Sequence, residues 1–248
     1  MTAPFDFKEI NKMEKEKYKM IGIIGAMEIE IKTIRSKMEG KQSSTAGGME
    51  FVSGTLNGTP VVTAVCGIGK VCAAMCTQAM VINYKPSLII NTGVGGTLTD
   101  ELSVCDICVA DNVCQHDFDL TSIGSPAGEI PAINAVKIPC DARAVEILTE
   151  CAKRFDGIKV KTGTVASGDQ FIAGDAQRQR IIDLFGASAC EMEGGSIGQV
   201  CRLNNIPFAV VRAISDSADG SAEMSYNEFL PLAADNAAKM IEDIVAKY

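Results

Sequence analysis

The sequence has few residues able to hold a metal ion, because only one histidine, His116, occurs among its 248 residues. A structural zinc site is built from several Cys and His ligands at characteristic spacings. The one Cys-x-x-Cys pair, Cys105 and Cys108, lies in a strand-like segment, where alternation would point the two thiols to opposite faces. Other cysteines lie in apolar runs. We therefore predict reduced cysteines in the core and neither a metal nor an organic cofactor.

Long apolar runs and basic clusters are also absent. No stretch reaches the roughly 18 apolar residues that a transmembrane helix needs. Residues 1–19, rich in Lys and Glu, lack the apolar segment of a signal peptide. The formal net charge is −8 with dispersed Lys and Arg, whereas nucleic-acid binders gather these residues in a basic footprint. We therefore expect a cytoplasmic protein that binds neither membranes nor nucleic acids.

No linker, internal repeat or low-complexity segment divides the chain. It is 47% hydrophobic and 22% charged, which predicts one large domain over residues 20–248, preceded by an N-terminal extension of residues 1–19. Strand-like and helix-like segments alternate along the domain. This pattern predicts an α/β fold with a largely parallel or mixed sheet flanked by helices.

The expected elements follow the apolar periodicity of each segment. Expected strands cover residues 20–24, 60–66, 87–91, 104–110, 158–166, 188–192 and 207–214. Expected helices cover residues 26–38, 70–83, 141–154, 175–185 and 194–203, with a last helix from Pro231 to about Lys247. Asn57-Gly58 predicts a hairpin, residues 92–98 a glycine-rich loop, and residues 115–137 irregular structure.

The segment 207–214 is almost continuously apolar, as in a strand buried on both faces, yet it contains Arg212. A guanidinium in such a place is costly unless an anion pairs with it. Ser215 and Asp216 follow directly, at the carboxyl end of the strand, where open α/β sheets bind their ligands. We therefore predict that Arg212, Ser215 and Asp216 form a polar cluster in a binding site.

Two further acids stand at strand-to-helix junctions. Glu30 lies at the edge of an apolar helical stripe and in the first helical turn, where the macrodipole favours a carboxylate. Glu191 and Glu193 flank Met192 beside glycines that let a ligand approach, and a carboxylate there can accept from both hydroxyls of a vicinal diol. The alternatives are an ordinary N-terminal helix glutamate for Glu30 and helix-capping acids for the pair.

Two glycine-containing segments are candidates to complete a site. Residues 166–174 present Phe171 and Ile172, and an exposed aromatic in such a loop suits stacking on a planar ring, although a core position is the alternative for Phe171. Residues 91–97 resemble a phosphate or ribose cradle. A dinucleotide-binding fold is disfavoured, because the first strand and its turn lack the G-x-G-x-x-G spacing and no acidic residue closes a second strand.

Five segments, in chain order, carry a resemblance to a known family. They are Ile-Gly-Ile-Ile-Gly-Ala-Met-Glu-Ile-Glu (21–30), Asn-Thr-Gly-Val-Gly-Gly (91–96), Ser-Gly-Asp-Gln-Phe-Ile (167–172), Glu-Met-Glu-Gly (191–194) and Val-Val-Arg-Ala-Ile-Ser-Asp (210–216). Together they closely resemble the bacterial 5′-methylthioadenosine/S-adenosylhomocysteine nucleosidases over residues 20 to about 246. The resemblance implies a three-layer αβα fold of the nucleoside phosphorylase type with a central twisted mixed sheet. It also implies a homodimer that hydrolyses the N-glycosidic bond of both nucleosides and releases adenine.

Residue by residue, the resemblance gives the catalytic roles to two carboxyl groups. Asp216, steered by Ser215, is implied as the general acid at adenine N7, and Glu30, assisted by Arg212, as the holder and activator of the attacking water. Departure of adenine leaves an oxocarbenium-like sugar, so protonation of the base and stabilisation of the cation are the main demands. We expect a protonated Asp216 and an ionised Glu30, with environments that push their pKa values apart.

The resemblance also implies binding roles around these acids. Glu193 and the backbone of Met192 would bind the ribose hydroxyls beside the segment that contains Gly96, while Phe171 would stack on adenine and the Ile172 backbone would read its edge. The residues implied to line the apolar ribose and 5′-alkylthio region are Met27, Ile68, Met192 and Tyr226. The residues implied to complete it across the dimer interface are Leu120, Ile123 and Pro131.

Some positions depart from the family pattern, and several functions stay open. Val94 stands where many members carry a serine near the ribose, and Tyr226 replaces a frequent phenylalanine. The acidic turn at residues 27–30 would repel phosphate, which favours hydrolysis over phosphorolysis. The alternatives are a futalosine-type nucleosidase, a nucleoside phosphorylase and, outside the enzymes, a non-catalytic nucleoside-binding or storage protein.

Overall fold

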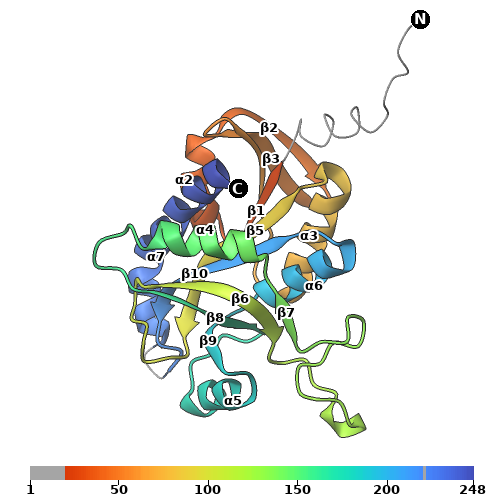
Figure 1. Ribbon diagram of the computed structural model, residues 1–248, viewed down its shortest axis with the longest axis vertical. Coiled ribbons are helices and arrows are strands. Elements are labelled where there is room, and N and C mark those ends of the chain that lie inside the picture. Colours follow the sequence, from red (N-terminus) through yellow and green to blue (C-terminus); the bar gives the residue numbers. More distant parts are fainter. Residues whose placement is uncertain (1–19, 220–221) are drawn as a thin grey trace, which may run out of the picture.

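The computed structural model describes the backbone of residues 20–219 and 222–248, and the side chains of these residues except 222–226. Over this part, one mixed sheet of ten strands carries helices on both faces, which confirms the predicted α/β fold (Figure 1). The strands are β1 (Ile21–Gly25), β2 (Glu39–Ala46), β3 (Met49–Leu56), β4 (Thr59–Val65), β5 (Leu88–Thr97), β6 (Ile107–Gln115), β7 (Lys137–Pro139), β8 (Val160–Ser167), β9 (Ala187–Glu191) and β10 (Phe208–Asp216). The helices are α2 (Glu28–Lys37), α3 (Lys70–Tyr84), α4 (Ala142–Ala152), α5 (Asp175–Phe185), α6 (Gly194–Asn204) and α7 (Ala222–Lys247), with a 3-10 turn η1 (Thr121–Ile123). The predicted extension of residues 1–19 lies outside the described residues.

Five strands of the sheet close on themselves. β10 pairs in parallel with β5 and antiparallel with β6, and the path from β6 through β8 and β9 back to β5 completes a ring. An open wing of four strands extends from β5, in the spatial order β1, β4, β3 and β2. β10 and β5 therefore have partners on both sides and no free edge. The sequence predicted most of the strands but not this closure.

Apolar side chains form a core on each face of the sheet. α2, α4 and α7 pack on one face, where Ala233, Ala234, Ala237 and Ala238 of α7 are buried and their small side chains let the helix lie close to β5 and β10. α3 and α6 pack on the other face. All ten cysteines are free, and the prediction that they are core residues is confirmed for the eight that are buried but not for Cys72 and Cys105, which are partly exposed.

The hairpin predicted at Asn57-Gly58 is confirmed. Both residues have positive φ, 50° and 79°, and Leu56 pairs with Thr59 across the turn. These angles suit the two-residue turn whose twist matches that of the flanking strands.

Three local predictions were wrong. Residues 92–97 continue β5 instead of forming a loop, because their small side chains fit a strand that is buried over its whole length. α7 begins at Ala222 and runs through Pro231 instead of beginning there, since proline removes one N–H donor while packing against the sheet supports the rest of the helix. Cys105 has φ 75° and lies in a turn before β6, not in a strand.

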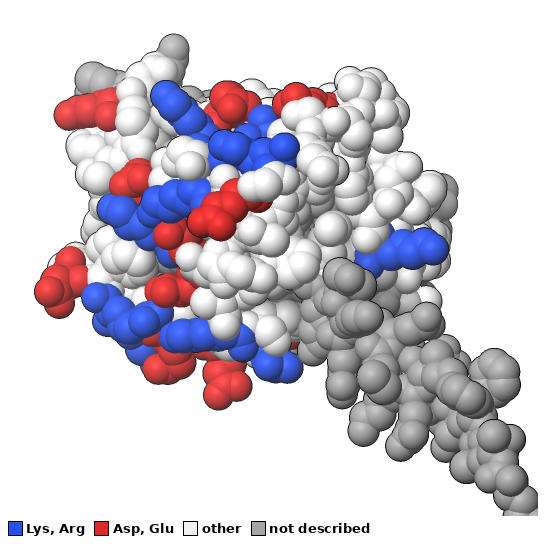
Figure 2. All heavy atoms as spheres, turned by 90° about the horizontal axis from the view of Figure 1, so that it is seen from above, with Lys and Arg blue, Asp and Glu red and all other residues white. Residues whose placement is uncertain are grey.

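The surface in Figure 2 carries charges of both signs. Basic and acidic side chains are interspersed on this face, and they do not form the basic patch that nucleic-acid binders present. Among the described helices, none combines the length and the apolar composition that a membrane crossing requires.

Candidate active site

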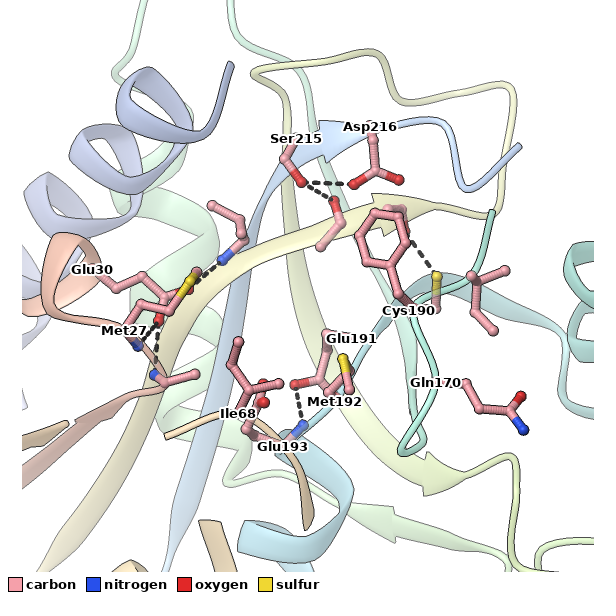
Figure 3. Close-up of a pocket in the computed structure, with 16 residues that line it drawn as sticks. Met27, Glu30, Ile68, Gln170, Cys190, Glu191, Met192, Glu193, Ser215 and Asp216 are labelled. Atoms are coloured by element: carbon pink, nitrogen blue, oxygen red, sulfur yellow. Dashed lines mark hydrogen bonds between the residues drawn. The ribbon is translucent and has the colours of Figure 1, made fainter. Parts of the chain in front are cut away.

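A cavity of about 280 Å³ lies where six strands end (Figure 3). It is lined by residues that follow β1 and β9, by the last residues of β5 and β10, and by the loops after β4 and β8. The lining residues are Ala26, Met27, Glu30, Ile68, Val94, Gly95, Gly96, Gln170, Phe171, Ile172, Cys190, Glu191, Met192, Glu193, Ser215 and Asp216. Segments that are distant in the chain thus meet at the strand ends, where α/β sheets bind ligands.

Ten of the twelve predicted site residues line this cavity, namely Met27, Glu30, Ile68, Gly96, Phe171, Ile172, Met192, Glu193, Ser215 and Asp216. Arg212 is not among the lining residues, and Tyr226 belongs to α7 with a side chain outside the described residues. The segment between β6 and β7 contains Leu120, Ile123 and Pro131, and none of the three lines the cavity of its own chain.

Glu30 reaches the cavity from the first turn of α2. Its Oε2 accepts hydrogen bonds from the N–H groups of Ala26 (2.7 Å) and Met27 (2.9 Å), and its Oε1 accepts from the N–H of Val94 (3.1 Å). Burial raises the pKa of this carboxyl, although Arg212 and the three N–H donors act in the opposite direction. A buried carboxylate held on both oxygens has a fixed orientation and is a stronger base than an exposed one.

Asp216 ends β10 on the other side of the cavity (Figure 3). Its Oδ2 accepts from the Ser215 hydroxyl (2.8 Å) and its Oδ1 from the N–H of Ala218 (2.9 Å). Burial raises the pKa of Asp216, and these two hydrogen bonds oppose the shift. Burial therefore raises the pKa of both carboxyls, whereas the sequence predicted that their environments would push the two values apart.

Two glycines of β5 make room for the two acids. A Cβ atom at Gly93 would lie 2.5 Å from Glu30 Oε1, and a Cβ atom at Gly96 would lie 2.6 Å from Asp216 Oδ1. Non-bonded atoms do not approach so closely, so a side chain at either position would displace a carboxyl group. The two glycines therefore contribute to the site by leaving room for the carboxyl groups of Glu30 and Asp216.

Arg212 pairs with Glu191, the acid that the sequence analysis left without a specific role. Its Nη2 donates to Glu191 Oε2 and to Asn91 Oδ1, while its Nη1 donates to the carbonyl oxygens of Asn91 (3.3 Å) and Val211 (2.9 Å). Both side chains of the ion pair are 2% exposed, so loss of either partner would leave a buried charge unpaired. The buried arginine in the sequence predicted an anion, but only the pairing of the strands shows which acid supplies it.

The Glu191 carboxylate is held in its ionised form. Burial acts to raise its pKa, but Arg212, the Ser167 hydroxyl and the Gly194 N–H outweigh burial and lower the pKa. Within the described part of the chain, the Nη atoms of Arg212 donate to Glu191, Asn91 and Val211, its Nε has no hydrogen-bond partner, and no hydrogen bond joins Arg212 to Glu30. The influence of Arg212 on Glu30 is therefore electrostatic.

Glu193 is the third buried carboxyl at the cavity. Its Oε1 accepts from the N–H of Gly69 at the start of α3 (2.8 Å). Burial, together with the neighbouring charge of Glu191, raises its pKa to about 7 against the effects of Arg212 and the Gly69 N–H. The folded protein therefore binds a proton at Glu193 more tightly than the unfolded chain does.

Glu193→Gln is expected to stabilise the protein at high pH. Because the folded pKa of about 7 exceeds the ordinary value of 4.5, the contribution of Glu193 to stability is lost as pH rises through this window. The neutral amide avoids this loss and still accepts from Gly69. At about 1.4 kcal/mol per pKa unit, the gain at pH 8 is on the order of a few kcal/mol. Melting temperatures from pH 5 to 8.5 measure it, with Glu39→Gln on the exposed β2 as control. Equal pH dependence of the two variants would contradict the raised pKa.

The remaining lining is largely apolar. Ile68 and Phe171 are 56% and 46% exposed, whereas Ile172 is 4% exposed. Phe171 is therefore not a core residue, and the alternative considered for it was wrong. Gln170 and Cys190 also line the cavity, and the sequence analysis gave neither residue a role, although Gln170 lies in the segment 167–172 that it singled out.

Comparisons with known proteins match nearly the whole described chain. A family model described as the phosphorylase superfamily matches residues 20–246. The 5′-methylthioadenosine/S-adenosylhomocysteine nucleosidase of Neisseria meningitidis, solved with methylthio-immucillin-A, is 36% identical with a TM-score of 0.90, covering 93% of this chain and 100% of that one. An aspartate-to-asparagine mutant of the Helicobacter pylori enzyme, solved with 5′-methylthioadenosine in its active site, is 33% identical with a TM-score of 0.88, covering 93% and 99%. A futalosine hydrolase of Helicobacter pylori is 33% identical with a TM-score of 0.89, covering 94% and 100%.

Proposed function

The chain belongs to the phosphorylase superfamily, and we propose that it is a nucleosidase that hydrolyses the N-glycosidic bond of 5′-methylthioadenosine and S-adenosylhomocysteine. The resemblance that the five sequence segments predicted is confirmed by the matches at 33–36% identity. The observation that carries the proposal is the pair of buried carboxyls, Glu30 and Asp216, on opposite sides of one cavity (Figure 3).

Asp216 is the proposed general acid. Its raised pKa favours the protonated form, which can donate to adenine N7 as the base leaves. The Ser215 hydroxyl and the Ala218 N–H hold the carboxyl in place. A proton delivered at N7 neutralises the charge that develops on the leaving base, and this lowers the barrier to bond cleavage.

Glu30 is the proposed base. Its three N–H donors fix the carboxylate at the cavity wall, where an oxygen can accept a proton from the attacking water. Val94 supplies one donor through its backbone, so the departure from serine at this position leaves that contact intact. The proposed ribose ligands, Glu193 and Met192, line the cavity beside Glu30.

The charge of the cavity favours water over phosphate. The described lining residues include Glu30, Glu191, Glu193 and Asp216 but no Lys or Arg. A phosphate dianion needs cationic or N–H donors that are not already committed to carboxylates. This charge distribution supports hydrolysis over phosphorolysis.

The proposed 5′-alkylthio region lies along Met27, Ile68 and Met192. We include in the proposal a homodimer in which Leu120, Ile123 and Pro131 complete this region of the partner's site. Ile123 is 77% exposed in its own chain, which supports its being available to cover a neighbouring surface.

Adenine release is the test of this function. We expect adenine from 5′-methylthioadenosine and S-adenosylhomocysteine, with free sugar as the second product and a rate that added phosphate does not change. One matched structure is a futalosine hydrolase, so cleavage of futalosine, followed by release of the base that it carries, is measured beside adenine release from 5′-deoxyadenosine. Faster cleavage of futalosine, formation of a sugar phosphate, or tight nucleoside binding without turnover would each overturn the proposed reaction in favour of its alternative.

A further inference from the structure

Two loops face the cavity without belonging to the sheet. Residues 66–69 connect β4 to α3 and carry Ile68, and residues 168–174 connect β8 to α5 and carry Phe171. Both side chains are about half exposed, so packing in the core does not fix them. The position of each depends on what holds its loop.

One carboxylate joins the two loops. Asp117 Oδ1 accepts from Lys70 Nζ at the start of α3 (2.6 Å), and Asp117 Oδ2 accepts from the N–H of Asp169 in the second loop (2.8 Å). The N–H of Lys70 in turn donates to Asp169 Oδ1 (2.7 Å). Lys70, Asp117 and Asp169 therefore form a closed cycle, which we call the loop clasp.

The loop clasp is anchored to the sheet and to the cavity. Lys70 Nζ also donates to Gln115 Oε1 at the end of β6 (3.1 Å). The preceding residue, Gly69, has φ 100°, and its N–H donates to Glu193. A Cβ atom at Gly69 would lie 3.0 Å from Asp169 Oδ1, so glycine permits the close approach of the two loops. The first N–H groups of α3, which have no partner within the helix, thus bind two carboxylates.

The ion pair of the loop clasp is more buried than ordinary surface ion pairs. The side chains of Lys70 and Asp117 are 16% and 18% exposed, and among the ion pairs of described residues only Arg212–Glu191 is more buried on both sides. Charge-assisted hydrogen bonds in such a setting are stronger and less screened than exposed ones. The loop clasp can therefore hold the two loops in a fixed position relative to each other.

We propose that Asp117 is a positioning residue, which through Lys70 and Asp169 holds the loops of Ile68 and Phe171 in place for binding of the nucleoside. This inference rests on the proposed function for the identity of the ligand. Asp117 does not line the cavity of Glu30 and Asp216 and touches no reacting group, so it acts on binding and not on the chemical step. The contact between Gly69 and Glu193 extends its influence to the proposed ribose carboxylate.

The test compares Asp117→Ala, Asp117→Asn and Lys70→Met in the full chain. The loss of a charge-assisted contact is expected to raise KM for 5′-methylthioadenosine roughly tenfold, with kcat within about twofold of the wild type. Asp117→Asn keeps an acceptor for the Asp169 N–H and should have the smaller effect. Lys161→Met, which removes the more exposed ion pair with Glu101, is the control and should change neither constant.

Hydrogen exchange gives a readout that does not need turnover. Asp117→Ala is expected to accelerate exchange in residues 168–171 and 66–70, while Lys161→Met leaves both segments unchanged. Unchanged exchange, or a fall in kcat at constant KM, would overturn the positioning role. A wild-type protein without activity on any nucleoside would instead refute the proposed function, and the exchange result would still decide whether the clasp holds the loops.

Discussion

Asp216→Asn is expected to lower kcat for 5′-methylthioadenosine by about a thousandfold, within the range that general acid–base groups contribute. Asparagine can keep the hydrogen bond from Ala218 through its carbonyl oxygen and donate to the Ser215 hydroxyl through its amide. It carries no transferable proton at adenine N7. The geometry is therefore preserved while the proposed proton donor is lost.

Binding and turnover together decide the role of Asp216. Calorimetric titration with 5′-methylthioadenosine should give a dissociation constant within a few-fold of KM for the wild type, while adenine release almost stops. Asp183→Asn on the exposed face of α5 serves as the control and should retain full activity. A variant at position 216 that turns over at the wild-type rate would remove Asp216 from the acid role.

Substitution of Glu30 is expected to lower the hydrolysis rate almost as much as substitution of Asp216. Glu30→Gln should lower hydrolysis by about a hundred- to a thousandfold, because the amide cannot accept a proton from water. The substitution has a second cost. One terminal atom becomes an NH₂ group that must face either the Val94 N–H or the N–H groups of Ala26 and Met27, and an unsatisfied buried donor costs about 1–3 kcal/mol.

Chemical rescue separates the two effects of losing Glu30. Glu30→Ala opens space at the cavity wall, and added formate is expected to restore part of the hydrolysis rate by acting as the missing base. Formate should have no effect on the wild type or on Asp216→Asn. If Glu30→Ala folds normally, binds nucleoside and hydrolyses it at nearly the wild-type rate, Glu30 does not hold the water.

Local patterns predicted much of the fold, because they depend on neighbours in the chain. The apolar strands and most helix limits follow from such patterns, as does the hairpin at Asn57-Gly58. Residues 92–97 look like a loop because glycine is unusual in strands, and here the glycines are needed where β5 passes two carboxyls. Pro231 marks a helix start in most contexts, but packing of α7 on the sheet overrides this preference.

In the site, too, local patterns predicted single residues but not the contacts between distant segments. Arg212 predicted a buried anion from its own position in an apolar strand, yet its partner Glu191 follows from the arrangement of β9 and β10 around β5. The raised pKa of Glu30 also depends on burial that only the assembled fold provides. The loop clasp joins Lys70 and Asp117 across segments with no common pattern, so no local signal indicated it.

Gly93 and Gly96 are two positions of β5 at which this protein does not tolerate a side chain. Alanine is the smallest replacement at either position, and its methyl group would overlap an oxygen of Glu30 or Asp216. Libraries designed to broaden the range of accepted nucleosides should therefore leave these two codons fixed and diversify the exposed rim. Natural substitutions at these two positions are expected to be selected against for the same steric reason.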